Sequence, residues 1–302
     1  MESRAAPSVY DRVSQGGFSF VEFSPSGEHM IAGSGTGEVG VFDVGTGAFT
    51  RIFEKGLASA KGGVFLDEET VIFSVGPVPP RRMRWRTGEA EEHPLPHSRA
   101  STAWGDGVLG LSWGRAISRI TMDSAVMISL DEAPSAYSLG PAPLFATTSG
   151  VVYRCLESGS IDRLFTLPFR PAHLAGRPER LFVADGKRVV AVGPEGSERW
   201  SHTRRSDITA MHADDEWLVV GERRGTVSVY DMDGELVAEV SAHTRLISEV
   251  VIRGDDVFTA SWDGTIRRLS LAVLSQSPAE IFSQMAENTG LSLQEAISDT
   301  VP

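Results

Sequence analysis

Two carboxylates and one imidazole in three short apolar segments are the residues of this chain best suited to acid–base or metal chemistry. When the segments FSFVEF, ITAMHA and ISEVVI are aligned, Glu22, His212 and Glu249 occupy positions of the same parity. In β-strands, such positions lie on one side. Three groups of this kind around one space could bind a divalent cation or serve as acid and base. His173 is the nearest fourth candidate, and the alternative interpretation is that all are solvated polar groups.

A second group of residues combines arginine with tryptophan in turns and connecting segments. Arginine presents a planar fork of donors that binds carboxylates and phosphates, and Arg and Trp are typical of interface hot spots. This composition indicates binding of acidic or phosphorylated peptides, or of another polyanion. Pairing with nearby acids such as Asp207 and Glu222 is the alternative. The group comprises Lys187, Arg204, Arg205, Arg223, Arg224, Arg245 and Trp262, with Trp113 and Arg115 from an earlier part of the chain.

A sequence repeat indicates which elements position these residues. The run GSGTGEVGVFDVGTG, which begins at Gly33, recurs as GERRGTVSVYDMDGE from Gly221 and again around SWDGTIRRL. Phe42 and Tyr230 are 188 residues apart, which is five steps of about 38 residues, and Leu269 follows after one step of 39. A unit of roughly 40 residues with alternating apolar positions and frequent turns is typical of a four-stranded propeller blade. The chain is therefore predicted to be all-β.

Seven such units are predicted, together forming one domain over residues 1–274. The third and fourth units are degenerate, so the count depends on how residues 97–170 are divided. The seventh unit lacks a fourth strand, and the segment 8–13 has no partner in the first unit. We expect this N-terminal strand to complete the last blade and close the propeller, which removes exposed sheet edges. The units span 18–54, 62–95, 100–130, 136–167, 172–201 and 208–240, and the last begins at 247.

The first unit resembles the WD-repeat family in its FSPSG and MIAGS segments, its GTG turn and its EVGVFDV strand. The resemblance implies a structural hydrogen-bond network inside a blade, for which His243, Ser261 and Asp263 match. It also implies that loops between the second and third strands and links between blades share one face. The arginine-rich group would lie on that face, and Glu22, His212 and Glu249 would line the central channel, away from the core between blades. The family's scaffold and recognition roles, in bacteria often in signalling, regulatory or defence assemblies, are implied as well.

Composition and charge narrow the function further. A net charge of −12 disfavours a general nucleic-acid binder. The single cysteine, Cys155, excludes an intrachain disulfide and fits a reducing cytoplasm, and no signal-peptide or membrane-spanning pattern is present. No catalytic motif of the common hydrolase, kinase or metalloprotease classes is found. We expect no membrane partner, no cofactor and no enzymatic activity.

The last segment, 275–302, is predicted to be a helical tail. Its run SPAEIFSQMAENTG has a capping box at its start and a glycine at its end. Ile281, Phe282 and Met285 form an apolar stripe that would dock on the domain or on a partner.

The sequence thus favours a non-catalytic scaffold or recognition module that binds partner proteins through an Arg-rich propeller face. Two alternatives stay open. One is a sensor of polyanions or small ligands, and the other is a metal-dependent hydrolase that uses Glu22, His212 and Glu249.

Overall fold

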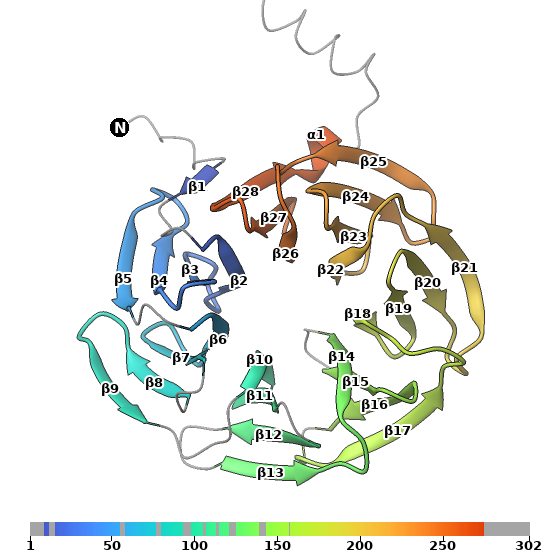
Figure 1. Ribbon diagram of the computed structural model, residues 1–302, viewed down its shortest axis with the longest axis horizontal. Coiled ribbons are helices and arrows are strands. Elements are labelled where there is room, and N and C mark those ends of the chain that lie inside the picture. Colours follow the sequence, from blue (N-terminus) through green and yellow to red (C-terminus); the bar gives the residue numbers. More distant parts are fainter. Residues whose placement is uncertain are drawn as a thin grey trace, which may run out of the picture.

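The computed structural model describes residues 9–11, 16–54, 58–76, 80–92, 98–104, 107–112, 115–120, 125–138, 143–156 and 158–274. Within these ranges the chain forms seven four-stranded antiparallel sheets and one four-residue helix, α1 (Leu271–Leu274). Figure 1 shows the sheets arranged around a common centre, with the first strand of each lying innermost. The prediction of an all-β chain with seven four-stranded units is confirmed. Trp113 and the tail residues Ile281, Phe282 and Met285 lie outside the described residues.

The sheets follow the chain in order and are numbered here from 1 to 7. Sheet 1 contains β2 (Phe18–Phe23), β3 (His29–Ser34), β4 (Val39–Asp43) and β5 (Phe49–Phe53); sheet 2 contains β6 (Ala60–Phe65), β7 (Thr70–Val75), β8 (Arg81–Arg84) and β9 (Glu89–Glu92); sheet 3 contains β10 (Ser98–Trp104), β11 (Gly107–Ser112), β12 (Ala116–Ile120) and β13 (Ala125–Ser129). Sheet 4 contains β14 (Pro134–Ser138), β15 (Leu144–Thr147), β16 (Val151–Cys155) and β17 (Ile161–Thr166); sheet 5 contains β18 (His173–Arg177), β19 (Arg180–Asp185), β20 (Arg188–Val192) and β21 (Glu198–Thr203); sheet 6 contains β22 (Ile208–Ala213), β23 (Trp217–Glu222), β24 (Thr226–Asp231) and β25 (Leu236–Ser241).

Sheet 7 combines strands from both ends of the described chain. It contains β26 (Ile247–Arg253), β27 (Asp256–Ser261), β28 (Thr265–Ser270) and, as its fourth strand, β1 (Val9–Asp11). β1 runs antiparallel to β28 with Tyr10 opposite Ile266. The Tyr10 side chain is buried against the ring of Phe42, and its hydroxyl donates to Val44 O at 2.7 Å. Tyr10 therefore connects sheet 7 with sheet 1.

Apolar clusters fill the space between neighbouring sheets. The ring of Phe20 packs into the cluster shared by sheets 1 and 2. It approaches the backbone so closely that a Cβ atom at Gly33 would lie 2.2 Å from Phe20 Cε1. Glycine is required at this position because only a residue without a side chain leaves room for the ring. None of the described helices is long and apolar enough to span a bilayer.

A bulge recurs near the start of the innermost strands. In six of the seven described sheets, the register between the first and second strands shifts at the second residue of the inner strand. Hydroxyl side chains at these bulges reach the first residue of the next inner strand. Ser19 Oγ donates to Ala60 O at 2.8 Å, Thr209 Oγ1 to Ile247 O at 2.6 Å, and Ser248 Oγ to Phe18 O at 2.8 Å. The same bond thus joins sheets 1 and 2, sheets 6 and 7, and sheets 7 and 1.

The links between sheets and the turns between second and third strands lie together. Arg204 N donates to Lys187 O at 2.8 Å, Arg223 N to Asp207 O at 2.8 Å, and Trp262 N to Leu246 O at 3.0 Å. Each bond joins a link residue to a turn residue, so these segments form one surface, which we call the link face. Gly225 ends one of these turns with φ +82°, and a Cβ there would lie 2.1 Å from His243 O.

Candidate functional site

The link face over sheets 5 to 7 holds most of the described members of the arginine-rich group, and Arg204 differs from the others because it is buried. Its side chain is only 9% exposed and lies between Glu222 and Glu239. Its Nε donates to Glu222 Oε1 at 2.8 Å, its Nη1 donates to Tyr230 Oη at 2.9 Å, and its Nη2 bonds Glu239. Burial by itself would lower the pKa of Arg204, but the bonds to Glu239 and Glu222 raise it above the ordinary value. Arg204 is a structural cation and not an exposed contact as the sequence predicted.

Glu222 forms the centre of this network. Its side chain is 2% exposed, and its Oε2 accepts from Ser206 N at 3.2 Å and from Ser206 Oγ at 2.8 Å. Both carboxylate oxygens of Glu222 are therefore occupied by donors. A buried carboxylate with this many partners is stable only while its guanidinium remains in place.

Arg223 also has an acidic partner, but at the surface. Its Nε donates to Asp207 Oδ2 at 3.0 Å, and both side chains are largely exposed. Exposed pairs of this kind contribute at most about 1 kcal/mol to stability. The alternative interpretation, in which arginines of this group pair with nearby acids, is therefore confirmed for two of them. Arg204 pairs with Glu222, and Arg223 pairs with Asp207.

The other described members of the group are exposed. Arg205 and Arg224 make no side-chain hydrogen bond or ion pair within the described part of the chain. Arg245 Nη1 donates to Trp262 O at 3.3 Å, and the Trp262 side chain is 47% exposed. Lys187 is exposed in the turn of sheet 5, and Arg115 is exposed at the start of β12.

Two pieces of the link face were missed by the sequence reasoning. Arg170 is exposed in the link between β17 and β18, where Leu167 N donates to Gly150 O at 2.9 Å. Its position in a link could have identified it by the same rule. The second piece is a pocket of about 230 Å³ above sheet 6, lined by Arg204, Arg205, Ser206, Glu222, Arg224, Thr226, Glu239 and Ser241.

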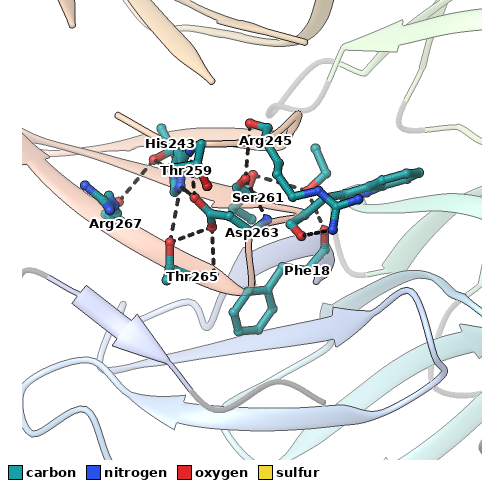
Figure 2. A network of polar contacts seen from close by, with 12 residues as sticks. Phe18, His243, Arg245, Thr259, Ser261, Asp263, Thr265 and Arg267 are labelled. Carbon is teal, nitrogen blue, oxygen red and sulfur yellow. Dashed lines mark hydrogen bonds and ion pairs between the residues drawn. The ribbon is translucent and has the colours of Figure 1, made fainter. Parts of the chain in front are cut away.

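Sheet 7 contains a hydrogen-bond network centred on His243 (Figure 2). His243 Nδ1 lies 2.9 Å from Asp263 Oδ2, and its Nε2 lies 2.8 Å from Thr259 Oγ1. Because burial outweighs the nearby carboxylate, the pKa of His243 is lowered. A neutral ring that donates from Nδ1 accepts the Thr259 hydroxyl proton at Nε2. Thr259 is fully buried, so this arrangement supports the turn and has no access to a substrate.

Ser261 was predicted to be a member of the His243 network, but its contacts differ. Its Oγ accepts from Asp263 N at 3.1 Å and lies 3.4 Å from Arg245 O, without reaching the imidazole. Thr259 fills that place because it is two residues earlier on β27 and points to the same side. Burial works to raise the pKa of Asp263, but bonds from Thr265 and Thr244 N lower it below the ordinary value.

Glu22, His212 and Glu249 lie on inner strands but at two different levels. Glu249 directly follows the bulge residue of β26, whereas Glu22 and His212 follow their bulge residues by three positions. The two-residue offset corresponds to roughly 7 Å along a strand. His212 Nδ1 accepts from Ile252 N of the next sheet at 3.3 Å. Among the described residues, no group of three or more His, Cys, Asp or Glu side chains could hold a metal ion.

The environment of these inner-strand groups disfavours their charged forms. Burial raises the pKa of Glu22 to about 7. Burial together with the charge of Glu22 raises the pKa of Glu249 to about 8. Burial lowers the pKa values of His212 and His173 to about 4. Glu22 lies on the same side of its strand as Phe20, which packs toward sheet 2, so these groups face neighbouring sheets and not only the centre.

Cys155, the single cysteine of the chain, is buried in sheet 4. Burial raises the pKa of its thiol to about 12. The thiolate form needed for nucleophilic attack is therefore scarce at neutral pH.

Comparisons with known proteins identify a similar fold. No protein-family model and no curated protein matches the chain. A solved structure, that of the computationally designed Ika8 protein, is similar with a TM-score of 0.60 and 15% sequence identity. The match covers 85% of this chain and 97% of that chain. At this identity the similarity concerns the fold alone.

Proposed function

We propose that this chain is a seven-bladed β-propeller of WD-repeat type, closed through β1, that serves as a non-catalytic recognition module of the cytoplasm. Its link face would bind acidic segments of partner proteins. The pairing of β1 with β28 and the Ser248 bond to Phe18 O support the closed architecture. The first brings a strand from the start of the chain into the last sheet, and the second joins sheets 7 and 1 by the bond that also joins sheets 1 and 2 and sheets 6 and 7.

One observation carries the function: the link face presents both cations without acidic partners and an exposed tryptophan, in a chain of net charge −12. Within the described residues, Arg205 and Arg224 have no partner, and Arg245 donates only to the backbone beside Trp262. Unpaired guanidinium groups on an otherwise acidic surface favour carboxylate or phosphate ligands. Trp262 adds a large apolar contact of the kind found at the centre of interfaces.

The opposite surface differs in this respect. It is formed by turns between first and second strands, and there Arg177 pairs with Asp215 at 3.1 Å while Arg180 donates to Asp215 O at 3.0 Å. Exposed arginines therefore occur on both surfaces. On the link face over sheet 6, Arg205 and Arg224 are exposed and have no side-chain partner in the described part of the chain.

The test is binding of a fluorescein-labelled peptide of twelve alternating Glu and Gly residues, measured by fluorescence anisotropy. We expect the double variant Arg245→Ala/Trp262→Ala to weaken binding by about tenfold or more. The matched control, Arg177→Ala/Arg180→Ala, removes two arginines from the opposite surface and should bind as the natural chain does. Equal loss in both double variants would mean that binding is a nonspecific effect of charge, and the proposal would be wrong.

A longer polyanion distinguishes the sensor alternative. Heparin binding that falls steeply with added salt and exceeds peptide binding would favour a polyanion sensor. Peptide binding that keeps a Trp262-dependent part at high salt would favour protein recognition, because apolar contact is not screened.

A further inference from the structure

We infer that the pocket above sheet 6 is a phosphoryl-binding subsite that takes the phosphorylated serine or threonine side chain of a partner. This inference rests on the proposed function and specifies part of the link face. The pocket is formed by the link before β22, the turn between β23 and β24, and the last residues of β25.

The two available cations of the pocket have fixed backbones and free side chains. Arg205 lies between Arg204, whose N donates to Lys187 O, and Ser206, whose N donates to Glu222. Arg224 lies between Arg223, whose N donates to Asp207 O, and Gly225, whose N donates to Glu222 O at 3.0 Å. The backbones of both arginines are therefore held on two sides of one pocket. Only the side chains have to become ordered when a ligand binds, which lowers the entropic cost of binding.

The acidic residues in the pocket wall do not cancel this charge. Glu222 and Glu239 both bond Arg204, and Glu222 also accepts from the Ser206 hydroxyl. With Arg204 counted, the lining carries three arginines and two carboxylates, which leaves one net positive charge. Glu222 and Glu239 hold Arg204 in place, so Arg205 and Arg224 are the two arginines that remain available to a ligand.

The remaining polar groups of the wall suit phosphate oxygens. Thr226 and Ser241 are direct partners in the pairing of β24 with β25, so their side chains emerge next to each other. Neither hydroxyl has a hydrogen bond in the described part of the chain. A hydroxyl can donate to an anionic oxygen. The pocket thus combines two guanidinium forks with two hydroxyl donors.

Size and charge favour a phosphorylated side chain over a carboxylate or a nucleotide. The volume of about 230 Å³ is below the range of roughly 300–1,000 Å³ usual for sites that enclose larger ligands. A phosphomonoester carries a charge of about −1.5 to −2 and three acceptor oxygens. It can accept from both arginines at once, whereas a carboxylate with two oxygens is satisfied by one arginine fork.

The experiment is isothermal titration calorimetry of the full chain with the capped pentapeptide Gly-Gly-phosphoserine-Gly-Gly, its serine and glutamate counterparts, and inorganic phosphate. We expect the phosphopeptide to bind at least about tenfold more tightly than the glutamate peptide. Arg205→Ala and Arg224→Ala should each weaken phosphopeptide binding by about tenfold or more. The control Arg177→Ala, which removes an arginine of the opposite surface, should leave binding unchanged.

Each contrary result has a distinct meaning. No phosphopeptide binding, or binding unaffected by Arg205→Ala and Arg224→Ala in variants that melt like the natural chain, would overturn the subsite. Inorganic phosphate that binds as tightly as the phosphopeptide would overturn the assignment to a protein side chain. If acidic-peptide binding still depends on Arg245 and Trp262 while the phosphopeptide does not bind, the subsite fails and the proposed function stands. If only the phosphopeptide binds, the broader acidic-peptide function fails.

Discussion

The turns of sheets 6 and 7 have similar backbones, but the equivalent side chain points into the sheet in one turn and out to solvent in the other. Both turns end in a glycine of left-handed conformation, Gly225 with φ +82° and Gly264 with φ +91°. In sheet 7 the residue before the glycine is Asp263, whose side chain turns inward to His243. In sheet 6 the equivalent residue is Arg224, which is exposed and unpaired within the described residues. Glu222 and Arg204 support the sheet 6 turn instead, which leaves Arg224 available to a ligand.

The largest expected effect is on the ionic support of sheet 6. Glu222→Ala leaves the buried Arg204 without one of its two acidic partners and Ser206 without an acceptor. Loss of one member of a buried pair costs about 3 kcal/mol or more. We therefore expect a clear fall in the free energy of unfolding, measured by urea denaturation. A change below about 1 kcal/mol would show that Glu239 and solvent are sufficient partners for Arg204, and that the two turns differ less than the contacts indicate.

The next effect compares the inner strands of the same two sheets. Directly after the bulge, sheet 7 has Glu249 where sheet 6 has Ala210. The pKa of Glu249 is about 8 in the folded chain, well above its ordinary value near 4.5. Between these values the folded chain holds a proton that the unfolded chain releases, so stability falls as pH rises through this window.

Glu249→Gln removes this dependence. We expect the variant to be more stable than the natural chain at pH 8, by on the order of 2 kcal/mol, and equal to it near pH 4.5. Thermal melting at both pH values is the measurement. If the variant is destabilised equally at pH 4.5 and pH 8, the carboxyl group is needed in both protonation states and the burial argument fails.

A smaller effect tests which hydroxyl supports the turn of sheet 7. Thr259→Val keeps the shape of the side chain but leaves His243 Nε2 buried without a donor. This should cost about 1–2 kcal/mol. Ser261→Ala should cost less, since Ser261 accepts one backbone bond and does not contact the imidazole. The reverse order in chemical denaturation would restore Ser261 as the partner of His243.

The smallest effect on stability comes from making the two turns alike. Arg224→Asp places the sheet 7 residue in the sheet 6 turn and changes only an exposed side chain. Stability should change by less than about 0.5 kcal/mol, while phosphopeptide binding should be lost because one of the two available cations becomes an anion. A large loss of stability would show that Arg224 has a structural role like that of Asp263.

The arrangement into seven sheets could be predicted from the sequence, because the interval of about 38 residues between Phe42 and later matches reports the size of the repeating unit directly. Parity indicated the side of the inner strands on which Glu22, His212 and Glu249 lie, but not their depth. The bulge falls at the second residue of all three strands, so Glu249 lies two residues nearer to it than Glu22 and His212 do. Alternation alone also carries no information about the burial that raises the pKa values of both glutamates.

The hydrogen-bond and ion-pair partners of individual side chains could not be predicted from the sequence pattern either. Arg204 and Arg205 are neighbours of the same chemical kind in the same link, yet the side chain of Arg204 is only 9% exposed while Arg205 is exposed. The difference arises because Glu222 and Glu239 meet around Arg204 from two other segments of the sheet. Membership of the link face followed from turn positions, but which of its arginines are available depends on contacts between residues 18 to 35 positions apart.

The shared construction of sheet 7 has a consequence for synthesis on the ribosome. β1 leaves the exit tunnel first, but its partner β28 is made only after more than 250 further residues. Until then the hydrophobic ring of Tyr10 has no place in the last sheet, and the nascent chain carries an unmatched strand throughout translation. Moving residues 9–11 behind residue 274 in a circular permutant would bring both partners out together and shorten that wait.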